Sequence, residues 1–163
     1  MRGQVEPEQL KADLILPWAI LGIMAAMLVA YIIVCQTIGG QLQQPMPETQ
    51  RVLIRTVLYV IAIVTFPLTN LIRYIQLRLN QTMPYSRTEH KNEAKNRYLV
   101  TVIVSLSLIE SIGAFGFVMF ILGDNFNSLY IFTGLSALGL FLYRPKVNEY
   151  ASIVEALTAQ KQE

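Results

Sequence analysis

The sequence predicts an all-α protein, a four-helix transmembrane bundle that forms a single domain. Hydrophobic residues make up 53% of the 163 residues and charged residues only 15%, whereas charged residues form about 25% of a typical soluble domain. The charges are also unevenly placed, since four long apolar stretches hold only two charged residues between them. Polar segments that contain glycine or proline separate these stretches, as loops separate membrane spans.

The first predicted span covers residues 14–38 and contains no charged side chain. A helix of about 20 residues crosses the hydrocarbon core of roughly 30 Å, so this stretch is long enough. Trp18 lies near its start, and tryptophan is enriched at the membrane interface. The preceding residues lack a basic region, and the apolar run exceeds the roughly 7–15 residues of a signal peptide. We therefore expect an uncleaved first span.

The second predicted span covers residues 52–72 and follows a polar loop that contains Pro45 and Pro47. Pro67 lies inside this span. A membrane helix tolerates such a proline when a hydroxyl group or water satisfies the freed carbonyl, and Thr65 offers a hydroxyl nearby. We expect a local kink at this position.

A polar segment, residues 74–97, separates the second span from the third. Its Ser86 and Glu89 fit the capping box, in which a serine cap is followed three residues later by glutamate. The third helix is therefore expected to begin near Arg87, in water, and to run into the membrane. Its apolar part covers residues 98–122.

The fourth predicted span covers residues 126–143 and follows a tight turn at residues 123–125. A tail of residues 144–163 comes after it. Apolar residues recur in this tail at helical spacing, and they are Tyr150, Ile153, Val154 and Leu157. The tail is expected to form a short amphipathic helix on the membrane or against residues 74–97, or to fray.

Lysine and arginine indicate the orientation. They are concentrated in residues 74–97 and 144–163, whereas the loop between the third and fourth spans has none. The loop between the first and second spans has only Arg51 and Arg55, at the edge of a helix. Because cytoplasmic loops carry the excess of positive charge, we expect residues 74–97 and both termini in the cytoplasm. The predicted location is the cell membrane, as a multi-pass protein.

Glu110 is the acidic residue at the middle of the third span, so it should lie near the centre of the bilayer. Inserting a carboxylate there costs at least about 2.5–3.5 kcal/mol, and burial favours its protonated form. An acid that is neutral at rest and can release its proton suits reversible binding of a proton or a sodium ion. The alternative is a permanently protonated side chain that donates one hydrogen bond to a neighbouring helix.

Two sets of residues surround this position in the prediction. The candidates for an ion-binding site with Glu110 are Ser107, Ser111, Thr65 and Tyr59, and Tyr31 is a further candidate for a hydrogen bond to its carboxyl group. Small residues allow membrane helices to approach closely, and the candidates for this packing are Gly113, Ala114, Gly134, Ala137 and Gly139.

Residues 108–118, Leu-Ile-Glu-Ser-Ile-Gly-Ala-Phe-Gly-Phe-Val, resemble the carboxylate-bearing helix of rotary ATPase proteolipids, the subunit c family. That helix carries a glutamate followed by small residues, an aromatic residue, a small residue and aliphatic residues. The resemblance implies that Glu110 binds H⁺ or Na⁺. The similarity covers this helix alone, and the fourth span has no second acid, so the chain is more similar to small bacterial four-span membrane proteins with one such helix. The resemblance also implies that the protein lies in the bacterial inner membrane.

The sequence leaves two functions open, one in ion handling and one in structure or assembly. The first is a small accessory or ion-handling subunit, active in ion transport, with Glu110 as a titrating carboxylate. The second is a non-catalytic structural or assembly partner of a larger membrane complex. The expected partners are the lipid bilayer and other transmembrane helices, in a larger complex or a homo-oligomer. No enzymatic activity, cofactor or nucleic-acid partner is predicted. His90, beside Glu89 and Glu93, reads as a solvated helix start, so no metal site is predicted either.

Overall fold

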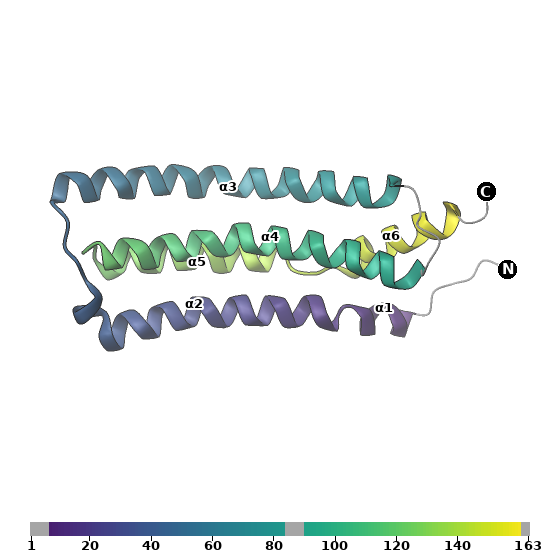
Figure 1. The fold of residues 1–163 in the computed structure, drawn as a ribbon, viewed down its shortest axis with the longest axis horizontal. Helices are drawn as coiled ribbons and strands as arrows, with labels where there is room; N and C mark the ends of the chain where they lie inside the picture. The colour runs from purple at the N-terminus through teal and green to yellow at the C-terminus, as the bar shows by residue number, and fades with distance from the viewer. Residues whose placement is uncertain (1–6, 84–89, 161–163) are drawn as a thin grey trace.

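The computed structural model describes residues 7–83 and 90–160, and this part of the chain is helical apart from short connections (Figure 1). The all-α class is therefore confirmed. The helices are α1 (Pro7–Asp13), α2 (Ile15–Leu42), α3 (Glu48–Thr82), α4 (His90–Ile121), α5 (Phe126–Leu142) and α6 (Val147–Gln160).

Helix α4 is at the centre of the molecule and packs against α2, α3, α5 and α6. Figure 1 shows α2 and α3 on opposite sides of the pair formed by α4 and α5. Half of the most apolar stretch of α4 is buried, compared with 11% for α2 and 17% for α3. The two flanking helices therefore present most of their apolar side chains to the outside.

Three helical stretches are long and apolar enough to cross a membrane: Leu10–Leu42, Glu48–Thr82 and Asn92–Ile121. Helix α5 has 17 residues and meets the same criterion only together with α6, from which it is bent by 45°. The four predicted spans thus correspond to α2, α3, α4 and α5. Three of these helices extend beyond the predicted apolar limits, because the polar residues at their ends continue the helix.

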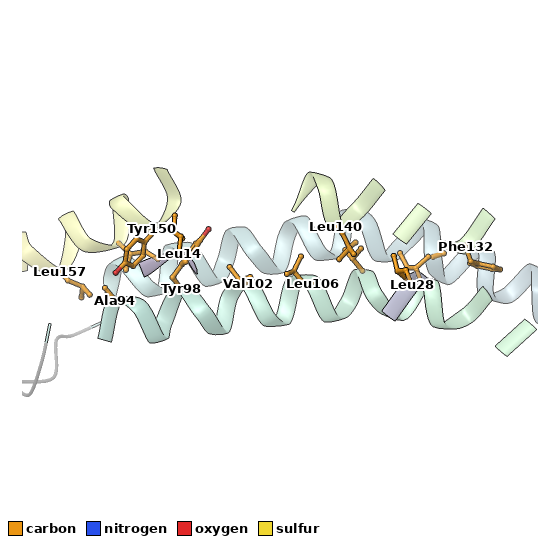
Figure 2. Packing of buried hydrophobic residues seen from close by; sticks show 14 of the residues in the cluster. Leu14, Leu28, Ala94, Tyr98, Val102, Leu106, Phe132, Leu140, Tyr150 and Leu157 are labelled. Carbon is orange, nitrogen blue, oxygen red and sulfur yellow. The ribbon is translucent and has the colours of Figure 1, made fainter. Parts of the chain in front are cut away.

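The apolar core follows α4 along the length of the bundle. Figure 2 shows Tyr98, Val102 and Leu106 of α4 in line along it, with side chains from the other helices packed around them. The largest core cluster also takes Leu28 from α2 and Phe132 from α5. Each flanking helix is therefore held against α4 by dispersion and close packing, the forces that associate helices in an apolar environment.

The loop between α2 and α3 packs on the turn between α4 and α5. The backbone N–H of Gln44 donates to the carbonyl of Ile121 at 2.7 Å. Gly123 has a φ of 89°, a left-handed conformation that glycine adopts without a steric penalty. The predicted turn is confirmed, and Asn125 caps α5 by accepting a hydrogen bond from the backbone N–H of Ser128.

The opposite end of the bundle collects α1, α6, the end of α3 and the start of α4 (Figure 1). Helix α6 packs against α1, α3 and α4, with Tyr150, Ile153 and Leu157 buried. Of the alternatives for the tail, the structure therefore contains the helix docked against the segment predicted as residues 74–97.

The structure describes the helix around Pro67 but not the predicted start of the third helix. Helix α3 continues through Pro67, and the hydroxyl of Thr65 donates to the carbonyl of Ile61, not to the carbonyl of Ile63 that the proline frees. The predicted capping box, Ser86 to Glu89, and the predicted helix start at Arg87 lie outside the described residues. From His90 the chain is helical, so this helix begins well before the apolar part of the third span.

Candidate functional site

Glu110 lies near the middle of α4, and its side chain is 8% exposed. Ser107, one turn earlier, is exposed, and Ala114, one turn later, is half-buried. Glu110 therefore sits at the edge of the buried face of α4. This edge faces α2, because Phe117 stacks on Tyr31 of α2 with ring centroids 5.2 Å apart.

The carboxyl group of Glu110 makes no hydrogen bond of ideal geometry with the described residues. Both of its oxygens are shielded from solvent. The Tyr31 side chain of α2 lies close enough to the carboxyl group to act as its hydrogen-bonding neighbour, although the contact does not reach ideal hydrogen-bond geometry with either oxygen. Of the candidates predicted on other spans, Tyr31 is therefore the one that lies beside the Glu110 carboxyl group.

The two serines predicted to join Glu110 contribute no ligand to it. The hydroxyl of Ser111 donates to the carbonyl of Leu108, in its own helix, at 2.7 Å. Ser107 is exposed on the outer side of α4. Ser111 directly follows Glu110, and adjacent residues on a helix do not face each other. Ser107 lies one turn before Glu110, but its hydroxyl makes no hydrogen bond of ideal geometry to the carboxyl group.

The candidates from the second span, Tyr59 and Thr65, belong to α3. Tyr59 stacks on Phe132 of α5, with ring centroids 4.5 Å apart, and Thr65 bonds to its own helix. Helix α3 lies on the opposite side of α4 from α2 (Figure 1), whereas Glu110 is at the edge facing α2. The described structure therefore does not bring these two residues to the carboxyl group of Glu110.

The small residues predicted for helix packing divide into two groups. A Cβ atom on Gly113 would lie 2.3 Å from Leu28 of α2, and one on Gly139 would lie 2.5 Å from Ile109 of α4. These two glycines are therefore required for close contact. Gly134 has open space around it and Ala137 is exposed. Ala114 is half-buried on the edge that carries Glu110.

Close approach between α4 and α5 also depends on a glycine that the sequence reasoning missed. A Cβ on Gly116 would lie 2.8 Å from the Cβ of Phe132 and 3.1 Å from the carbonyl oxygen of Leu129. The same interface contains a hydrogen bond from Ser136 to the carbonyl of Ile109 at 2.9 Å. The spacing of Gly113 and Gly116 was the available signal, since both lie on one face of a helix.

The sequence reasoning also missed a buried arginine at the end of the bundle that carries α1 and α6, called the polar end below. This arginine links α3 to α6 and to the residue that follows α5. Arg73 donates to Glu149 of α6 at 2.6 Å and to the carbonyl of Tyr143 at 2.8 Å. The Tyr98 hydroxyl of α4 donates to the same glutamate at 3.2 Å. The sequence did offer a signal, because Arg73 lies at the end of an apolar span and the amphipathic tail contains an acidic residue, Glu149.

A second charged cluster closes the opposite end. Arg55 of α3 lies 3.2 Å from Asp124, whose carboxylate also accepts a hydrogen bond from Ser128 at 2.6 Å. Arg51 donates to the carbonyl of Gly123. Both arginines therefore make their contacts at the edge of the helix, outside its most apolar part.

The two arginine clusters bracket the apolar part of the bundle. Arg55 and Arg73 are 18 residues apart on α3, which corresponds to about 27 Å along a helix. Glu110 lies on α4 between the levels of these clusters, near their midpoint, with no described cation beside it. Its carboxyl group can therefore take up or release a proton, or offer an oxygen ligand to a cation, without first breaking an ion pair.

Comparisons with protein-family models, with curated proteins and with solved structures find no match to this chain.

Proposed function

We propose that the chain is an integral membrane protein whose helices α2, α3, α4 and α5 cross the bilayer. The outer faces of α2 and α3 support this, since side chains such as Ile23 and Ile63 are 63% and 68% exposed, and lipid rather than water suits such a surface. The separation of the two arginine clusters, about 27 Å, is close to the hydrocarbon thickness of roughly 30 Å.

The end that carries α1 and α6 faces the cytoplasm in this proposal. The lysines and arginines outside the apolar stretches are concentrated there, in agreement with the positive-inside rule. The resemblance of residues 108–118 to the carboxylate helix of proteolipids points to a bacterial inner membrane.

Within that membrane, Glu110 acts as a reversible proton or cation site of a small accessory or ion-handling subunit with no catalytic role. The observation that carries this function is a buried carboxyl group at mid-depth on the central helix, with Tyr31 beside it and no hydrogen bond of ideal geometry among the described residues. Intramembrane ionisable residues are costly, and they mark ion pathways and proton relays.

A structural or assembly partner is the second candidate, and a specific surface favours it. Gly22, Ala26 and Ala30 are exposed on α2 at four-residue spacing, and such small-residue rows let transmembrane helices approach closely. In this alternative Glu110 is a permanently protonated hydrogen-bond donor to a neighbouring helix.

Infrared difference spectroscopy separates the two functions. The protein is reconstituted in lipid vesicles, and spectra are compared across pH and between sodium and potassium. A reversible site predicts a carbonyl band of a buried protonated carboxyl that disappears at high pH or with sodium. The band should be missing in Glu110→Gln and retained in Glu93→Gln, whose carboxylate is paired with Arg97 in the native chain. A Glu110 band that neither pH nor sodium changes would exclude the titrating role and leave the assembly role.

A further inference from the structure

An apolar groove runs between α2 and α5, on the opposite side of the α2–α4 contact from Glu110. Its volume is about 550 Å³, within the range of roughly 300–1,000 Å³ that is usual for ligand sites. The apolar side chains along its wall include Leu21, Ala25, Val29 and Ile32 of α2 and Ala137 and Leu140 of α5.

One end of the groove, called its mouth here, has a positively charged side chain and lies at the polar end of the bundle. Arg144 lines the groove, and its guanidinium lies 4.5 Å from the ring centroid of Phe141. No carboxylate among the described residues pairs with it. The backbone carbonyl of Arg144 accepts a hydrogen bond from Arg73, so this mouth is at the cluster that marks the edge of the apolar zone. Trp18 lines the same groove, and tryptophan favours the membrane interface.

The depth of the groove corresponds to one leaflet. Along α2 its lining runs from Trp18 to Ile32 and along α5 from Thr133 to Phe141. At the rise of an α-helix these stretches are about 21 Å and about 12 Å long, with a mean of about 16 Å. This is close to half of the hydrocarbon core, which is roughly 30 Å thick. A transmembrane helix from a partner would need a surface that continues across both leaflets, whereas a lipid chain needs only this depth.

We propose that this groove holds one acyl chain of an anionic phospholipid of the cytoplasmic leaflet, with the lipid phosphate on Arg144. The arginine matches the headgroup in charge and in hydrogen-bonding geometry, and the apolar wall matches the chain. The proposal rests on the membrane placement above but not on the titration of Glu110.

Trp18 provides the test, because it is the single tryptophan of the chain and lines the groove. Brominated acyl chains quench tryptophan fluorescence on contact. Protein in phosphatidylcholine vesicles is titrated with brominated phosphatidylglycerol or, separately, with brominated phosphatidylcholine. The native protein should be half-quenched at a lower mole fraction of the anionic lipid. Arg144→Gln should raise that mole fraction by roughly five-fold, the factor that one arginine near an anionic surface contributes.

Two further variants make the outcome specific. Arg78 is an exposed arginine at the same end of the bundle, where it contacts Tyr74, and it does not line the groove. The Arg78→Gln protein should therefore keep the preference for the anionic lipid. Ala137→Phe adds bulk to the groove and should abolish the preference while Arg144 is intact. Equal quenching of the native protein by the two lipids would overturn the site. Inserted protein that neither lipid quenches would overturn it too, because another helix would then cover Trp18. Failure of the protein to float with the vesicles would instead refute the membrane placement.

Discussion

At the scale of single residues, Glu110 differs in chemistry from the other unpartnered buried groups. Thr69 and Thr133 also bury hydroxyl oxygens without a described partner. A carboxyl group costs more to bury than a hydroxyl group, and far more when it is ionised. Other buried polar side chains, such as Ser105 and Ser136, donate to backbone carbonyls. Burial of Glu110 therefore costs stability, and costs of this kind are common at functional sites.

Substitution of Glu110 should show how much its burial lowers the free energy of unfolding. Removing a buried polar group that has no partner relieves a penalty of about 1–3 kcal/mol. Glu110→Leu should therefore raise the free energy of unfolding by about this amount, while Glu110→Gln should stay near the native value. Thermal unfolding followed by circular dichroism in a mild detergent measures both variants. A destabilised leucine variant beside a native-like glutamine variant would show that the side chain contributes a hydrogen bond.

The sequence predicted where Glu110 lies along its helix and that Tyr31 lies near it, but not which other residues surround it. Depth follows from counting residues along an apolar stretch. The neighbours depend on which helix lies beside each face of α4, and the apolar pattern of the chain does not encode that order. Tyr59 and Thr65 were therefore expected at the site, although α3 packs on a different face of α4 from the edge that carries Glu110.

At the scale of elements, the contact between α4 and α5 depends on backbone proximity. Gly116→Ala would place a Cβ 2.8 Å from the Cβ of Phe132, an atom that cannot move without its backbone. Overpacking of this kind costs typically about 1–3 kcal/mol. The matched control is Gly134→Ala, because nothing lies within 4 Å of the added Cβ. Thermal unfolding should rank Gly116→Ala well below the native protein and Gly134→Ala at or above it. Equal effects would contradict the described interface.

The docking of α6 depends on the arginine that the sequence reasoning missed. Arg73→Gln leaves Glu149 without its closest cation. Removing one partner of a buried ion pair costs about 3–5 kcal/mol, and Glu149 is 19% exposed, so we expect a loss at the lower end of this range. Limited proteolysis should then cut the tail near residue 147 faster than in the native protein. Arg78→Gln, at an exposed position on the same helix, should leave the cleavage rate unchanged.

A second polar contact fixes the same helix to α1. The Tyr150 hydroxyl donates to Asp13 at 3.0 Å. Burial raises the pKa of Tyr150 above its ordinary value, and the neighbouring Asp13 adds to the shift. The tyrosine therefore remains a neutral hydrogen-bond donor through the physiological range. The sequence predicted a helical tail from its apolar spacing, whereas the partners that hold it come from α1, α3 and α4, which no local pattern specifies.

At the scale of the whole molecule, the hairpin arrangement sets which segments share an end. The loop between α2 and α3 and the turn between α4 and α5 lie at one end, and α1 and α6 lie at the other (Figure 1). Four crossings with short connections produce this arrangement in a membrane bundle. It could be predicted from the sequence because each apolar stretch is close to one membrane thickness. The lateral order of the helices could not be predicted, since it depends on side-chain shape.

Cysteine labelling tests the orientation in the membrane. Single cysteines at the exposed positions Gln44, Asn127 and Ser152, in a Cys35→Ser background, are treated in intact cells with an impermeant thiol reagent. Positions 44 and 127 should react, and position 152 should react only after the membrane is opened. Reaction at position 152 alone would invert the orientation, and reaction at all three positions in intact cells would contradict insertion.

The most direct measurement for the titrating role of Glu110 is its reactivity with a hydrophobic carbodiimide, which modifies protonated carboxyl groups in apolar surroundings. The protein is treated in its native membrane, and the modified residue is identified by mass spectrometry. We expect modification at Glu110 that falls as pH rises and when sodium is added, with no such product in Glu110→Gln. Modification that neither pH nor sodium alters, or its complete absence at acidic pH, would contradict a reversible proton or cation site.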